Sequence, residues 1–180
     1  RGRFMQQAIP SGEGGMLVAL GISSEEIQKI LDGANDTYEC YIANDNSKIQ
    51  VVLSGLMKDI DLLSKDLETR KIKNIKLNVS APFHCKYMKS ASNKMTSFIN
   101  NLKITKLNKP IISNVTAKEV YSPEEIKILL ISQIEKKVRW LESVEYMINN
   151  GVKNFVEIGP GKVLSGLIKR INKDVNVKSI

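Results

Sequence analysis

The stretch MLVALGISSEEIQKILDG, residues 16–33, decides the fold, because a short apolar run leads directly into an amphipathic helix. Gly21 ends the apolar run. Ser23 and Glu26 have the Ser-x-x-Glu spacing of a capping box, which opens a helix. Apolar residues then recur at helical spacing up to a stop near Gly33. The stretch predicts a β-strand followed by an α-helix.

The segments that follow predict the rest of one small unit. Strands are expected at residues 41–43 and 49–53, on either side of a polar turn at 44–47. A second helix is expected where apolar residues recur at helical spacing between 56 and 67, and residues 75–79 alternate as a half-buried strand does. The resulting order is βαββαβ, which is the ferredoxin-like pattern.

The remainder of the chain alternates predicted helices and strands, which indicates part of a layered α/β core. Ser122 and Pro123 supply an N-cap and a first-turn proline for one of the helices. Apolar residues on one face predict helices, and short apolar runs predict strands, at the following positions: helices at 88–102, 123–134, 140–150 and 163–171, strands at 110–115 and 154–158.

Composition limits the classes of function. The 180 residues carry a net charge of +8, and no apolar run approaches the ~20 residues that a membrane helix needs. The first residues do not read as a signal peptide, and we expect no membrane partner. The excess of lysine suggests an acidic partner, although scattered lysines more often only solvate a surface. The chain starts at Arg1, not at methionine, and we expect it to be a piece of a longer protein.

The chain holds two cysteines, Cys40 and Cys85, and one histidine, His84. That count excludes a zinc cluster or a disulfide framework and suits a reducing compartment. We therefore expect no metal and no bound cofactor.

His84 is the candidate catalytic residue that the sequence itself offers. Pro82 keeps the preceding residue out of helical geometry, so the histidine is expected at a strand end or in a loop. Histidine is the side chain whose ordinary pKa suits a general base near neutral pH. A lone histidine can equally be structural. Cys85 is a poor nucleophile for it, because neighbouring side chains on an extended segment point to opposite faces.

The motifs of two common enzyme classes are missing. An acyltransferase on such a scaffold needs a Gly-x-Ser-x-Gly elbow, and residues 11–15 have no serine between glycines at that spacing. Residues 159–162, Gly-Pro-Gly-Lys, lack the spacing of a phosphate loop and read as a tight turn into a helix.

Five ordered blocks nevertheless resemble the malonyl-CoA:acyl carrier protein transacylase family. They are RGRFMQQA at 1–8, NDNSKIQVV at 44–52, VSAPFHC at 79–85, SVEYM at 143–147 and EIGPGKVL at 157–164. The resemblance covers essentially the whole chain. It implies an α/β hydrolase-like core with an inserted ferredoxin-like subdomain, divided as follows: residues 1–13 end the first part of the core, 14–80 form the subdomain and 81–180 form the C-terminal part of the core.

The resemblance also implies roles for particular residues. His84 would be the general base that activates a serine, and the main-chain carbonyl of Gln133 would orient its ring. Arg1 would grip the free carboxylate of the malonyl group, a task that suits the planar guanidinium fork. The acyl pocket would lie near three other residues: Met5, Phe83 and Asn46.

The resemblance further implies partners. They would be a coenzyme A thioester, an acyl carrier protein and an upstream segment that carries the nucleophilic serine, in the cytoplasm of a bacterium or in a bacterially derived organelle. An acidic carrier could dock on a basic patch, for which the candidates are Lys162, Lys169, Arg170 and Lys173. Lys48 and Lys137 replace prolines common in the family, which affects local stiffness and not chemistry.

Two alternatives stay open. A basic RNA-binding module on the βαββαβ unit would need aromatic residues on its central strands, and the runs 16–20 and 49–53 carry none. We therefore expect no nucleic-acid partner. A non-catalytic or regulatory relative of the same fold would retain His84 and Arg1 as well.

Overall fold

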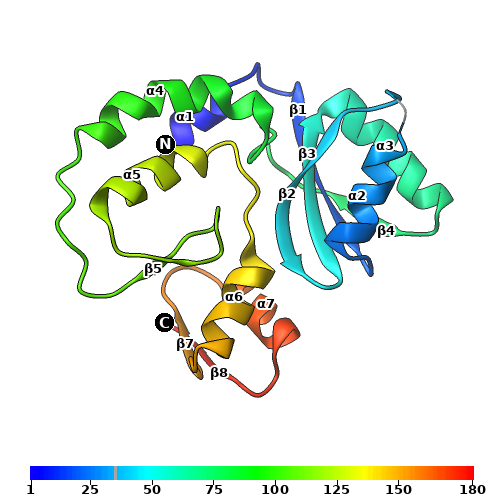
Figure 1. Ribbon diagram of the computed structural model, residues 1–180. Coiled ribbons are helices and arrows are strands. Elements are labelled where there is room, and N and C mark those ends of the chain that lie inside the picture. Colours follow the sequence, from blue (N-terminus) through cyan, green and yellow to red (C-terminus); the bar gives the residue numbers. More distant parts are fainter. Residues whose placement is uncertain (35) are drawn as a thin grey trace.

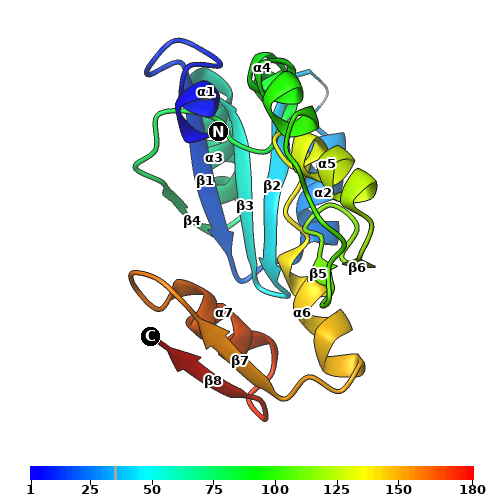
Figure 2. The ribbon, with the colours of Figure 1, turned by 90° about the vertical axis from the view of Figure 1, so that its left-hand side faces the viewer.

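The computed structural model describes residues 1–34 and 36–180. A four-stranded sheet with its helices forms one side of the molecule, and a group of helices around α4 forms the other (Figure 1). A small pair of parallel strands with two helices lies below the sheet (Figure 2). Within the described part of the chain, no helix has the length and apolar character needed to cross a membrane.

The sheet is antiparallel and has the strand order β2-β3-β1-β4. Its elements follow one another in the βαββαβ order that the sequence predicts: β1 Gly14–Leu20, α2 Ser24–Asp32, β2 Cys40–Ser47, β3 Gln50–Leu56, α3 Met57–Thr69 and β4 Lys73–Lys76. The predicted capping box at the start of α2 is confirmed, since the Ser23 and Glu26 side chains each accept from the other's backbone N–H.

Both faces of this sheet are covered. One face packs on α2 and α3, with Leu17, Leu53 and Leu63 fully buried between them. The other face carries Val18 and packs against Phe83, next to the candidate base in sequence. Side chains alternate between the two faces of a strand, so the same sheet supports the helices and the site.

Leu53→Ala is expected to lower the free energy of unfolding by about 2–5 kcal/mol. The Leu53 side chain, on the inner strand β3, is fully buried, so its loss leaves a cavity in the core. Denaturant unfolding of the variant would measure this. Leu62→Ala is the matched control, since Leu62 is 41% exposed on α3 and should cost about 0.5 kcal/mol. Equal losses in both variants would contradict the assignment of this core.

The prediction of a polar turn at residues 44–47 is wrong. Strand β2 continues to Ser47, and the turn is formed by Lys48 and Ile49. The amide of Asp45 donates to the carbonyl of Val138 at 2.9 Å, and its carboxylate accepts from the Ser24 hydroxyl at 2.7 Å. Contacts with distant segments therefore satisfy polar groups that the local sequence assigns to a turn.

Three helices form the other side of the molecule. They are α1 Gly2–Gln6, α4 Lys89–Asn100 and α5 Pro123–Ser132, and α4 contacts both of the others. Ser122 caps α5 as predicted. Phe98, one of the apolar residues in the predicted helix 88–102, is 60% exposed and packs beside the Phe4 ring. The strand predicted at 110–115 is limited to β5 Ile111–Ile112, paired with β6 Glu119–Val120.

The last elements form a small layer of their own. They are α6 Trp140–Asn149, β7 Asn154–Glu157, α7 Val163–Ile171 and β8 Asn176–Ser179, and β7 pairs with β8 in parallel. Val144, Ile168 and Val175 are buried between them. Strand β8 was not predicted, because its alternating polar residues carry a weak strand signal.

Candidate active site

His84 lies in the connection between β4 and α4. Its φ of +60° is left-handed, a region that histidine enters more often than most residues. Pro82 before it is buried, and the 3-10 turn Lys86–Met88 follows it. The Cys85 thiol donates to the carbonyl of Pro82 at 3.0 Å. Such a backbone conformation persists only where its surroundings hold it, and here the segment is fixed on both sides.

The imidazole of His84 contacts a main-chain carbonyl far away in the sequence. Its Nδ1 lies 2.9 Å from the oxygen of Gln133, the residue that ends α5. This is the contact that the family resemblance implies. A carbonyl only accepts, so Nδ1 carries the proton in the neutral ring and Nε2 keeps the lone pair. The arrangement leaves Nε2 as the basic nitrogen.

The surroundings favour the neutral imidazole. Burial lowers the pKa of His84, the carbonyl of Gln133 opposes this, and the positive charge of Arg1 lowers it further. The ring is therefore uncharged at neutral pH, which is the form that a general base needs.

This shift predicts how His84 titrates. Because the imidazole binds a proton less tightly in the folded chain, the unfolded state binds more protons between the lowered pKa and about 6.5. The free energy of unfolding should rise with pH through that window and fall as the pH drops through the folded pKa. An NMR titration of the only histidine in the chain should have its midpoint below 6.5. In His84→Gln this part of the pH dependence should vanish, and a midpoint above 6.5 would contradict the assigned surroundings.

The other predicted site residues come from several elements. Arg1 precedes α1, with its side chain exposed and its charge close enough to affect the histidine. Met5 is buried in a cluster against which the half-buried Phe83 packs. Asn46 is half-buried on β2.

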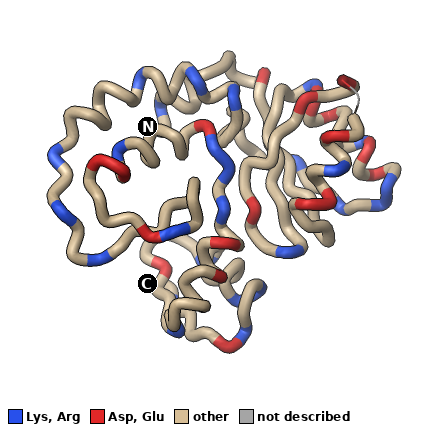
Figure 3. Tube along the Cα trace, viewed as in Figure 1, with Lys and Arg blue, Asp and Glu red and all other residues tan. Residues whose placement is uncertain are grey.

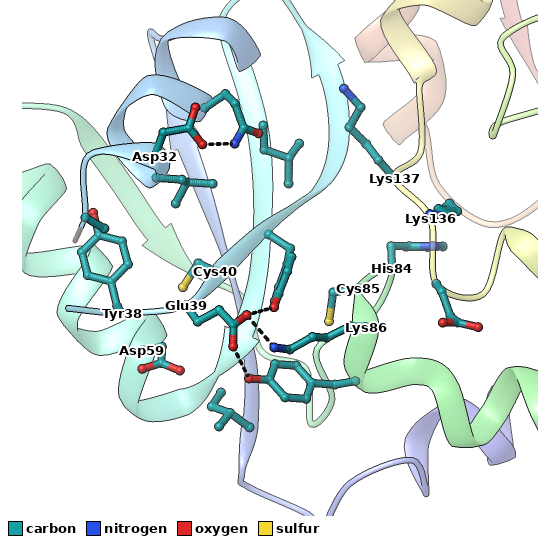
Figure 4. A pocket seen from close by; sticks show the side chains of 18 of the residues that line it. Asp32, Tyr38, Glu39, Cys40, Asp59, His84, Cys85, Lys86, Lys136 and Lys137 are labelled. Atoms are coloured by element: carbon teal, nitrogen blue, oxygen red, sulfur yellow. Dashed lines mark hydrogen bonds and ion pairs between the residues drawn. The ribbon is translucent and has the colours of Figure 1, made fainter. Parts of the chain in front are cut away.

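A depression of about 1230 Å3 opens between the sheet unit and the segment around His84. Among the predicted site residues only His84 lines it. Figure 4 shows Lys136 and Lys137 on the side of His84, and Asp32 and Asp59 toward α2 and α3. No local motif marks these four lining residues, so the sequence does not predict them as part of a site.

The two thiols are poor nucleophiles at neutral pH. Burial raises the pKa of Cys40 to about 12 and also raises that of Cys85, so both stay protonated. Cys85 is 2% exposed and packs in the interior. Across residues 1–34 and 36–180, no three His, Cys, Asp or Glu side chains are grouped so that they could hold a metal ion.

Positive charge is spread over the molecule. Lysines and arginines lie along the sheet unit, the long α4–β5 connection and the C-terminal layer (Figure 3). The lysines and arginines are therefore not gathered on one face of the Cα trace.

Comparisons with known proteins define the class. No protein-family model matches the chain. The malonyl CoA-acyl carrier protein transacylase of Bacillus subtilis is 39% identical over 96% of this chain, and that of a Staphylococcus aureus strain is 39% identical over all of it. The chain spans only 55% and 59% of the lengths of these two relatives.

Solved structures agree with the sequence relatives. The transacylase of Clostridium perfringens superimposes with a TM-score of 0.94 at 38% identity, covering 99% of this chain and 57% of the other. A malonyl-transacylase solved in complex with the acyl-carrier protein of a type II PKS gives 0.93 at 33% identity, covering 99% and 58%. Fold and sequence thus agree on one family, that of the transacylases. The chain belongs to the malonyl CoA-acyl carrier protein transacylase family.

Proposed function

We propose that this chain is the C-terminal part of an enzyme that moves malonyl groups from malonyl-CoA to the phosphopantetheine thiol of an acyl carrier protein. The observation that carries the proposal is the hydrogen bond between His84 and the carbonyl of Gln133. The sequence relatives of the chain are named malonyl CoA-acyl carrier protein transacylases, which supports the proposal. The related structure solved with a carrier protein supports the choice of acceptor.

The proposed architecture is an α/β hydrolase-like core interrupted by a ferredoxin-like subdomain at residues 14–80. The strand order β2-β3-β1-β4, with both helices on one face, supports the subdomain. Residues 1–13 and 81–180 would then belong to the core. The parallel pair of β7 and β8 supports this part, since hydrolase-like cores are built on parallel strands.

The proposed chemistry is acyl transfer in two steps. A serine from a segment outside these 180 residues attacks the malonyl thioester, and Nε2 of His84 takes its proton. The tetrahedral intermediate collapses, the C–S bond breaks, and the imidazolium returns the proton to the departing coenzyme A thiolate. In the second step His84 takes the proton of the carrier's thiol, which attacks the acyl-serine, and then returns it to the serine oxygen. The Gln133 carbonyl keeps Nδ1 protonated throughout, so Nε2 alone exchanges protons.

Arg1 is proposed to bind the malonyl carboxylate through its guanidinium fork. Its position close to His84 supports this, because the malonyl carboxylate must lie near the reacting carbonyl. Phe83 is proposed to crowd an α-methyl group and so to disfavour methylmalonyl. Met5, which packs in the same cluster, and Asn46 complete the proposed acyl pocket.

The proposed carrier surface is smaller than the sequence suggests. Lys169 donates to the carbonyls of Lys173 and Val175, and Arg170 donates to Gln50 at 2.6 Å. Those two side chains therefore bind within the chain. Lys162 and Lys173 remain exposed candidates for contact with an acidic carrier, in a cytoplasmic or organellar setting.

The function is tested by incubating the full-length protein with malonyl-CoA and a phosphopantetheinylated carrier protein. We expect malonyl-carrier to form at enzymatic rates, and acetyl-CoA to be a poor donor. Formation no faster than without the protein would refute the proposal.

A further inference from the structure

Four side chains next to the candidate base form a cluster that neither the family motifs nor the proposed mechanism uses. The carboxylate of Glu39 accepts hydrogen bonds from Lys86 at 2.5 Å, from Tyr87 at 3.4 Å and from Tyr41. The ammonium of Lys86 lies 5.5 Å and 5.4 Å from the centroids of the Tyr41 and Tyr87 rings. These rings meet edge to face at 6.1 Å. We call these four residues the Glu39–Lys86 clamp (Figure 4).

The clamp differs from an ordinary surface ion pair. The side chains of Lys86 and Glu39 are 54% and 52% exposed, and an isolated pair of this kind contributes little to stability. Here, however, one cation meets a carboxylate and two aromatic faces at once, so several contacts hold the same lysine. The lysine lowers the pKa of Glu39, and the carboxylate raises that of Lys86, so both are charged at neutral pH.

The clamp joins two segments that are far apart in sequence. Glu39 immediately precedes β2 and Tyr41 lies within it, so both belong to the sheet unit. Lys86 and Tyr87 form the 3-10 turn that begins two residues after His84. The left-handed backbone of His84 needs support from its surroundings, and this turn is the adjacent piece of chain.

We propose that Glu39 and Lys86 are positioning residues for the base. By fixing the turn after His84 to the start of β2, they hold the imidazole against the carbonyl of Gln133. The expected effect on the rate of transfer rests on the proposed function. The expected effect on the position of the His84 ring does not.

Glu39→Gln and Lys86→Met, each in the full-length protein, test the proposal. We expect kcat to fall about tenfold with KM for malonyl-CoA unchanged, since small displacements of a catalytic group cost one to two orders of magnitude. The acid limb of the pH profile should move up toward 6.5 as the ring loses its buried position. The double variant should be no slower than either single variant, because both remove the same clamp.

Asp61→Asn is the matched control. It breaks the Lys76–Asp61 ion pair on the same sheet unit, where the side chains are 49% and 46% exposed. It should leave kcat and the pH profile unchanged. A structural role alone would lower the melting temperature of the clamp variants without moving the acid limb. That result would overturn the proposal, as would an equal loss of kcat in Asp61→Asn.

An NMR titration of His84 separates this inference from the proposed function. The resonance is assigned by its loss in His84→Ala. In Glu39→Gln the midpoint should rise toward 6.5, whether or not the protein transfers malonyl groups. An unchanged midpoint would refute the clamp even if wild-type activity is as proposed, and absence of wild-type transfer would refute only the function.

Discussion

His84→Ala in the full-length protein is expected to slow malonyl transfer by at least about 10²–10⁴-fold, because the variant has no base to take the proton of the serine. Removal of one member of a coupled nucleophile–base pair can cost more. Steady-state transfer to the carrier protein measures the effect, and circular dichroism verifies that the fold is retained.

Cys85→Ala is the neighbouring control. Its thiol is buried, burial raises its pKa, and it donates a hydrogen bond to the carbonyl of Pro82. It should keep activity within a few-fold of wild type. If His84→Ala stayed within threefold of wild type, or if Cys85→Ala caused the larger loss, the assignment of the base would be wrong.

Arg1→Ala is expected to reduce the preference for malonyl over acetyl by about 10²-fold or more. A guanidinium that binds a carboxylate bidentately gives a charge-assisted contact that acetyl cannot make. Sites built to bind a polar group reject analogues that lack it far more strongly than apolar pockets reject a missing methylene. Competition between malonyl-CoA and acetyl-CoA, with kcat/KM for each, measures the change.

Arg1→Lys separates charge from geometry. A lysine keeps the positive charge but loses the planar fork, so it should recover only part of the preference. An Arg1→Ala variant with unchanged malonyl preference would show that another group binds the carboxylate.

The sequence predicts most of the sheet unit because its signals are local. The capping box at Ser23 and the apolar alternation of β1 need no distant partner, and both are found. The exit from β2 was mispredicted because Asp45 is satisfied by Ser24 and Val138, far away in the chain. Local polarity could not reveal those contacts.

The same distinction applies to the site. His84 is recognisable because a proline fixes its loop and no other histidine competes with it. Gln133 carries no chemical signal of its own, because its backbone makes the contact, so only the family resemblance indicated it. Glu39 and Lys86 stand 47 residues apart and carry no motif, so only the fold shows that they meet.

His84 is proposed to activate a serine that lies outside these 180 residues. The most direct test of this role is to incubate the full-length protein with labelled malonyl-CoA, quench the reaction and digest the protein. Mass spectrometry then locates the covalent malonyl group. We predict one ester on a serine in a Gly-x-Ser-x-Gly segment outside residues 1–180, strongly diminished in His84→Ala. A malonyl adduct on Cys85, or on any other residue of this chain, would contradict the mechanism.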